Sequence, residues 1–81
     1  MMTREEIMAE VNKIFCKVFD DDTIILTDTT NAEDIEDWDS LAQITLITEI
    51  QAKFKVVFEL KEILTLQNVG EMIDLIVAKY H

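Results

Sequence analysis

Apolar residues recur along most of the chain at the three- and four-residue spacing of amphipathic helices, in four separate segments. These segments predict helices over about residues 3–19, 40–54, 59–64 and 68–79. The sequence has no two segments of alternating apolar and polar residues that could pair as β-strands. The pattern therefore predicts an all-α fold, a small four-helix bundle with three longer helices and one short helix.

Capping residues support the starts of two of these helices. Thr3 followed by Glu6 has the spacing of a capping box, and so does Asn68 followed by Glu71. The periodicity also predicts which residues of the first two helices face the core. In the first helix they are Ile7, Val11, Ile14 and Val18, with Met8 and Phe15 beside them. In the second they are Leu41, Ile44, Ile47 and Phe54, in a stripe that Leu46 and Ile50 broaden.

A long connection, residues 20–39, separates the first two helices. A loop of this length inside a compact domain is usually functional or disordered. Its three consecutive apolar residues, Ile24, Ile25 and Leu26, favour an ordered loop that is held against the core. The short apolar run from Val56 to Phe58 is interpreted as a buried connector between the second and third helices.

Size and composition predict one small domain over residues 1–81, expected to be a monomer. No apolar run reaches the roughly 18 residues of a membrane span, and the first residues lack the apolar core of a signal peptide. The single cysteine, Cys16, cannot form an intramolecular disulfide or a Cys-rich metal site. We therefore expect a cytoplasmic protein.

The net charge of −10 is concentrated before the second helix. Residues 20–39 contain nine acidic residues and no lysine or arginine: Asp20, Asp21, Asp22, Asp28, Glu33, Asp34, Glu36, Asp37 and Asp39. This charge repels nucleic acids and anionic membrane surfaces, and it favours partner proteins with basic patches. The stretch is either a plain solvated acidic loop or a segment that steers basic partners, and the two interpretations are compatible.

Ser40 lies where the acidic loop turns into the second helix. Either Asp39 or Ser40 can cap that helix, so the serine has a purely structural interpretation as an N-cap. No neighbouring residue in the sequence can activate it as a nucleophile, because the single histidine is His81 at the chain end. We therefore expect neither a catalytic site nor a metal site, and a serine better placed to carry an anionic group than to attack one.

The whole pattern resembles the acyl carrier protein family. The resemblance lies in the acidic loop, in Asp39-Ser40-Leu41 followed by an amphipathic helix ending at Phe54, and in residues 58–63 and 68–73. It implies that Ser40 bears a 4′-phosphopantetheine arm, installed from coenzyme A by a Mg-dependent phosphopantetheinyl transferase that contacts Asp39. It further implies a carrier of acyl thioesters whose partners are activating and condensing enzymes with basic docking patches.

Docking residues follow from the same resemblance. Leu41 is expected to be a docking contact or a core residue, and Trp38 a docking contact or an anchor of the loop. Glu33, Glu36 and Asp37 are expected to meet the basic patches of partners.

The second helix departs from the fatty-acid carriers of this family, which have several acids on its exposed face. Glu49 is the only acid between Ser40 and Lys55, and the exposed face has Thr45 and Thr48 instead. The variant Trp-Asp-Ser-Leu resembles stand-alone carriers of specialised pathways. We therefore expect a specialised biosynthetic pathway, with an aminoacyl or peptidyl carrier and an unmodified acidic helical adaptor as alternatives.

Overall fold

The computed structural model describes residues 2–80, so Met1 and His81 lie outside the described residues. Its elements are α1 (Arg4–Phe19), α2 (Ser40–Phe54), α3 (Leu60–Thr65) and α4 (Val69–Tyr80). Each boundary lies within one residue of the range that the hydrophobic pattern predicts. The predicted all-α fold, with three longer helices and one short helix over the described residues, is confirmed.

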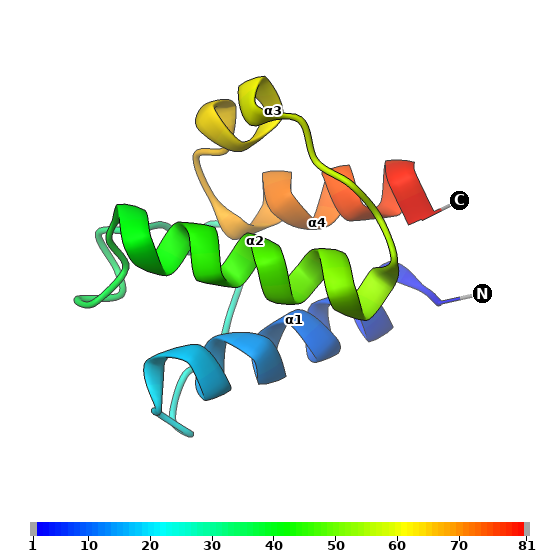
Figure 1. The fold of residues 1–81 in the computed structure, drawn as a ribbon. Helices are drawn as coiled ribbons and strands as arrows, with labels where there is room; N and C mark the ends of the chain where they lie inside the picture. The colour runs from blue at the N-terminus through cyan, green and yellow to red at the C-terminus, as the bar shows by residue number, and fades with distance from the viewer. Residues whose placement is uncertain (1, 81) are drawn as a thin grey trace.

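The helices form a small bundle in which α1 packs against both α2 and α4. Figure 1 shows the end of α1 and the start of α2 at the same end of the bundle, next to the loop of residues 20–39. The start of α1 and the end of α4 lie at the opposite end, and α3 crosses beside α2 and α4 as a separate short helix. Within residues 2–80, no helix is long and apolar enough to cross a membrane.

The core is built from one apolar face of each long helix, and no polar or charged side chain among the described residues is buried in it. Two residues of the connection between α2 and α3, Val56 and Phe58, and one of the long loop, Leu26, complete it. The helical core residues are Ile7, Val11, Ile14 and Phe15 of α1, Leu46, Ile47, Ile50 and Phe54 of α2, and Val69, Met72, Ile73 and Ile76 of α4.

Two residues expected in the core of α2 lie on its surface instead. The exposed fraction is 72% for Leu41 and 63% for Ile44. A helix turns by 100° per residue, so the buried face from Leu46 to Phe54 leaves Leu41 on nearly the opposite side. Ile44 lies roughly a quarter turn from that face. The predicted apolar stripe was therefore too wide, because apolar residues cover more of α2 than α1 and α4 can bury.

The sequence also predicted that more apolar residues of the loop would be buried than the structure shows. Leu26 is buried and Ile24 half-buried, but Ile25 is 83% exposed. Successive side chains of an extended segment point to opposite sides, so the core can take Ile24 and Leu26 only by leaving Ile25 outside. The same alternation exposes Val57 between buried Val56 and Phe58, which corrects the expectation of a fully buried connector.

Hydrogen bonds fix the long loop to α1. The side chain of Asn12 accepts a bond from the Leu26 N–H (2.7 Å) and donates one to the Ile24 carbonyl (2.9 Å). At the other end of the loop, the Trp38 ring packs edge-on against Phe15, with 5.1 Å between ring centroids. The expectation of an ordered loop is met at both places.

The middle of the loop is joined to the start of α4. The Gly70 N–H donates to the Asp28 carbonyl (2.9 Å), and the Val69 N–H donates to the Thr30 carbonyl (2.8 Å). These bonds satisfy two N–H groups at a helix start that have no partner within the helix. Arg4 closes the junction, since its guanidinium binds the carboxylates of Asp28 (2.9 Å) and Asp74 (3.1 Å).

Candidate functional site

Ser40 is the first residue of α2, and its neighbour Asp39 takes the capping role. The Asp39 Oδ1 accepts a hydrogen bond from the Ala42 N–H at 2.8 Å. The side chain of Ser40 is exposed, and no hydrogen bond joins its hydroxyl to any described residue. The interpretation of Ser40 as an N-cap is therefore wrong, and its hydroxyl lies at the solvent-facing start of a helix.

Trp38 anchors the loop immediately before this serine. Its indole Nε1–H donates to the Gln43 Oε1 at 2.7 Å, and its ring meets Phe15 of the core. These two contacts connect the last turn of the loop both to α2 and to α1. The anchoring role predicted for Trp38 is confirmed, and it fixes the direction from which the chain enters Ser40.

An apolar cavity of about 490 Å³ opens beside Ser40, between α2 and α3. Met72 of α4 contributes to it from the core, and Asp39 is the charged residue among the described side chains that line it. Most of the lining comes from two helices and the loop: Ser40, Gln43 and Ile44 of α2, Leu60, Ile63 and Leu64 of α3, and Ala32 and Trp38 of the loop. An apolar cavity with a few polar groups at its edge is typical of a binding site for a small apolar group.

The residues of α3 in this cavity were missed in the sequence. Leu60, Ile63 and Leu64 follow the i, i+3, i+4 spacing of one helix face, which was the available signal. Leu60 and Leu64 remain exposed, although a short helix normally buries its apolar face to be stable. In the structure, this exposed apolar face on so short a helix indicates a binding site.

Polar contacts hold α3 in place next to this cavity. The Lys79 ammonium of α4 binds the Glu62 carboxylate at 2.9 Å, and both side chains are about three-quarters buried. Glu62 also accepts the Glu59 N–H at the start of α3 (2.8 Å). The Glu59 N–H and then Lys79 lower the pKa of Glu62 below its usual value. The carboxylate therefore stays ionised at neutral pH and ties α3 to α4.

The other predicted site residues are divided between two sides of Ser40. Trp38 and Asp39 line the cavity, whereas Leu41 lies on the opposite side, where Asp37 and Asp39 face a shallow groove at the end of α1. Glu33 and Glu36 are exposed in the loop but line neither of these two depressions. The interpretation of Leu41 as a core residue is wrong, because the side chain is largely exposed.

The acidic loop keeps most of its charge unneutralised. Within residues 2–80, Asp28 is the loop acid that forms an ion pair, with Arg4. The described part of the chain contains no group of three His, Cys, Asp or Glu side chains close enough to hold a metal ion. The negative potential around Ser40 is therefore available to an approaching partner.

Comparisons with known proteins agree with this geometry. The family described as "Phosphopantetheine attachment site" matches residues 9–76, a range that includes Ser40 and both depressions. The chain belongs to the acyl carrier protein family. The solution NMR structure of a holo acyl carrier protein from Geobacter metallireducens is 43% identical, with a TM-score of 0.84. The match covers 89% of this chain and 83% of that one.

No curated protein shows a significant match to this sequence. Membership of the family makes this chain a carrier and not an enzyme, with 4′-phosphopantetheine as the prosthetic group. The described residues fit that group, because an exposed serine hydroxyl lies at a helix start beside an apolar cavity. Members of the family interact with phosphopantetheinyl transferases and with biosynthetic enzymes in general.

Proposed function

We propose that Ser40 bears the 4′-phosphopantetheine arm, and that residues 1–81 form a single carrier domain which presents acyl thioesters to partner enzymes. The observation that carries the proposal is the geometry at the start of α2. Asp39 caps the helix, so the Ser40 hydroxyl stays exposed at the edge of an apolar cavity. A serine that capped its own helix would have its oxygen engaged with the backbone.

The start of α2 suits the phosphodiester of the arm. Unpaired backbone N–H groups and the helix dipole favour a negative charge at this position. The arm supplies a thiol, whose free pKa of about 8.5 makes its thioesters good acyl donors. The flexible tether also gives the attached group a high effective concentration at the active site of a docked enzyme. Ser40 needs no base of its own, because the transferase brings the chemistry of attachment.

The cavity favours an acyl cargo over an aminoacyl one. Its lining includes Ile44, Leu60, Ile63, Leu64 and Met72. Each methylene that leaves water for such a lining gains about 0.8 kcal/mol, whereas a charged ammonium pays a desolvation cost there. An alkyl chain on the arm therefore fits the space beside Ser40. A peptidyl carrier and an unmodified adaptor remain the two alternatives.

Intact mass spectrometry tests the attachment. We expect the purified chain to gain the mass of one arm when it is incubated with coenzyme A, Mg²⁺ and a broad-specificity phosphopantetheinyl transferase. Omission of coenzyme A is the control and should leave the mass unchanged. A chain that stays unmodified with an active transferase, shown to modify another carrier in the same tube, would favour the adaptor alternative.

We further propose that Glu33, Glu36 and Asp37, together with exposed Leu41 and with Trp38 and Asp39, guide the transferase and other partners with basic patches to Ser40. The three loop acids have no ion-pair partner among the described residues. Long-range attraction by such charges raises association rates more than it changes final affinity.

The association rate with the transferase should fall as the salt concentration rises past the point where the Debye length is about 8 Å. The variant Glu33→Gln/Glu36→Gln should associate more slowly at low salt, because it weakens the attraction. The matched variant Glu5→Gln/Glu71→Gln has the same net charge but leaves the loop intact, so it should retain most of the rate. Stopped-flow mixing measures both, and equal slowing of the two variants would contradict a role for the loop.

We propose a specialised pathway in place of bulk fatty-acid synthesis. On the exposed face of α2, Thr45 and Thr48 stand where fatty-acid carriers have acids, and their hydroxyls donate to the carbonyls of Leu41 and Ile44. This face therefore offers few charges to a basic enzyme. We expect a bacterial fatty-acid malonyl transferase and ketosynthase to load the holo chain much more slowly than a housekeeping carrier. Comparable turnover would assign a general fatty-acid role.

The proposed working state is a monomer in the cytoplasm. Cys16 is a free thiol whose Sγ lies 3.7 Å from the Ile24 carbonyl oxygen in a half-buried position. An unpaired thiol of this kind is compatible with a reducing compartment. Size-exclusion chromatography with light scattering would measure the oligomeric state.

A further inference from the structure

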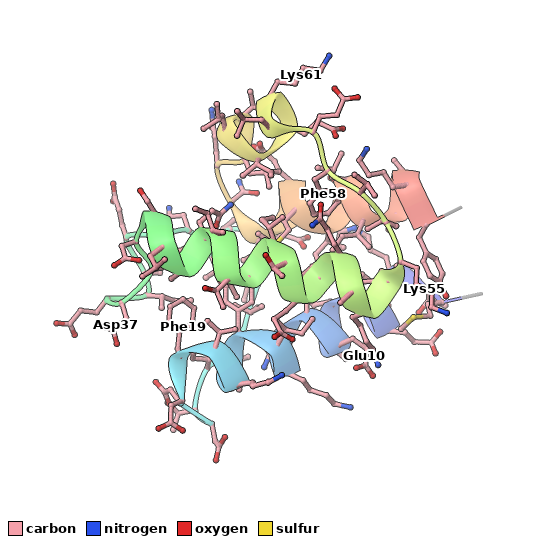
Figure 2. All side chains as sticks on the ribbon, in the orientation of Figure 1. Glu10, Phe19, Asp37, Lys55, Phe58 and Lys61 are labelled. Carbon is pink, nitrogen blue, oxygen red and sulfur yellow. The ribbon has the colours of Figure 1, made fainter. Side chains whose placement is uncertain are left out.

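Two half-buried amide side chains interrupt the apolar lining of the cavity beside Ser40. They belong to Gln43 of α2 and to Asn68, which directly precedes α4. The short helix α3 contributes only apolar side chains to the lining, and its Lys61 points away from the bundle (Figure 2). The polar groups that line the cavity therefore all come from outside α3.

The Gln43 amide is held in one orientation. The Trp38 Nε1–H, which can only donate, bonds to the Gln43 Oε1 at 2.7 Å, so this end of the amide is the oxygen. Its Nε2 is then the free end, and it donates no hydrogen bond within residues 2–80. Gln43 follows Ser40 by three residues, so the two side chains are neighbours on the helix surface. The cavity therefore has a fixed N–H donor about one turn from the proposed attachment site.

Asn68 presents a second donor for the same reason. Its Oδ1 accepts a hydrogen bond from the Glu71 N–H at 2.9 Å and so caps the first turn of α4. Its Nδ2 is left without a hydrogen bond to any described residue. The third amide of the lining, Gln67, is exposed, and its side chain has no such bond in the described part of the chain, so either end can turn inward. Gln43 and Asn68 are thus the two amide donors whose orientation the fold sets.

Fixed donors distinguish between cargoes that differ in oxygen content. A saturated chain in the cavity would cover both N–H groups, because it displaces water from them without offering an acceptor. A chain with a carbonyl or hydroxyl oxygen replaces that water and still places its methylenes against the apolar lining. Sites built around hydrogen-bonding groups reject analogues that lack the matching atom, since the groups of the site are then left unpaired.

We propose that this cavity selects acyl chains that bear carbonyl or hydroxyl oxygens, and that Gln43 and Asn68 recognise those oxygens. The inference rests on the proposed function, since the cargo reaches the cavity on the arm of Ser40. It narrows the cargo from acyl groups in general to oxygenated ones. The apolar lining holds the hydrocarbon part of such a chain, and the two amides hold its oxygens.

Two ligands that differ by one oxygen test the proposal. The probes are the octanoyl and 3-oxooctanoyl amides of aminopantetheine, in which an amide replaces the unstable thioester and the arm is identical. They are titrated into the ¹⁵N-labelled Ser40→Ala chain, which cannot be modified at that position. We expect the 3-oxo ligand to bind about two- to tenfold more tightly, the net effect of one hydrogen bond. It should also shift the side-chain NH₂ signals of Gln43 and Asn68 more than the saturated ligand does.

The direction of this preference is itself informative. In a cavity without hydrogen-bond donors, the 3-oxo ligand would bind more weakly, because it buries one methylene fewer and leaves a carbonyl desolvated. Tighter binding of the 3-oxo ligand therefore requires a donor that meets the added oxygen. The carbonyl groups of the arm do not contribute to the difference, because both ligands have the same arm.

Isosteric variants identify the donors. Gln43→Glu keeps an oxygen for the Trp38 N–H, and Asn68→Asp keeps the cap of α4, but each replaces a donor with an acceptor. Each should remove most of the preference for the 3-oxo ligand. Gln51 lies on α2 outside the cavity lining and accepts the Phe58 N–H at 2.9 Å. Gln51→Glu is therefore the matched control, which adds the same charge and should leave the ratio of the two affinities unchanged.

Four results would overturn the proposal: no binding of either ligand, equal or tighter binding of the saturated one, a preference that survives in both cavity variants, or shift changes confined to residues outside the cavity. The readout does not depend on attachment of the arm. A chain that gains the arm but shows no preference loses only the proposal on oxygenated cargo. A chain that shows the preference but never gains an arm loses only the proposed function.

Discussion

Replacing Ser40 with alanine should abolish attachment of the phosphopantetheine arm completely. The substitution removes the oxygen that forms the phosphodiester, and in the structure no other hydroxyl lies at the start of α2. The fold should persist, because the cap of α2 is the Asp39 carboxylate and not the Ser40 hydroxyl. We expect the free energy of unfolding to change by less than about 0.5 kcal/mol, the range of most surface substitutions.

The matched control is Thr45→Ala, which removes another exposed hydroxyl of α2 just over one turn further on. It should gain the arm like the wild-type chain. Intact mass after incubation with coenzyme A and transferase reads both variants, and chemical denaturation checks their folding. A mass gain that persists in Ser40→Ala, or that disappears in Thr45→Ala, would contradict the assignment.

Replacing Gly70 with alanine should destabilise the chain by about 1–3 kcal/mol, the usual cost of overpacking. Gly70 lies in the first turn of α4, and an added Cβ would be 2.8 Å from the Asp28 carbonyl oxygen and 3.1 Å from the Asp28 Cβ. The first of these contacts is with backbone, which cannot rotate away. The loop would have to retreat, which would weaken the hydrogen bond from the Gly70 N–H and the Arg4 contacts at Asp28.

Urea denaturation measures the loss, and amide shifts around residues 27–31 should report the displacement of the loop. Glu71→Ala places an alanine at the next position of the same helical turn and should cost less than about 1 kcal/mol. Alanine favours a helix over glycine by about 1 kcal/mol. A Gly70→Ala chain that is more stable than the wild type by about that amount would therefore show that the loop gives way without strain. A chain as stable as the wild type would already contradict the predicted net loss.

The helices could be predicted from the sequence because their signals are local. The capping pair of Thr3 and Glu6 is present as expected, with bonds of 2.9 and 3.1 Å, and the Glu71 N–H donates to the Asn68 side chain at 2.9 Å. Burial was harder to predict where a helix has more apolar residues than its neighbouring helices can cover. Leu41 therefore carries a helix-forming signal that does not distinguish a core position from a surface one.

Only part of the candidate site could be predicted from the sequence. Ser40 and Asp39 were found because their run resembles a known family, and the structure then gave them different tasks at the start of α2. The cavity was not found, because it depends on where Leu60 and Leu64 of a short helix lie relative to Ile44. The junction of Gly70 with Asp28 joins residues far apart in the chain, so no local pattern could have indicated it.

The position of the arm within the holo chain tests the assignment of Ser40 as the attachment site. Fragmentation mass spectrometry of the wild-type protein, modified by the transferase from coenzyme A, assigns the added mass to individual residues. We expect every fragment that contains Ser40 to retain the arm, and fragments that contain Thr45 and Thr48 without Ser40 to lack it. An arm on any other residue, or a folded chain that the active transferase leaves unmodified, would contradict this assignment.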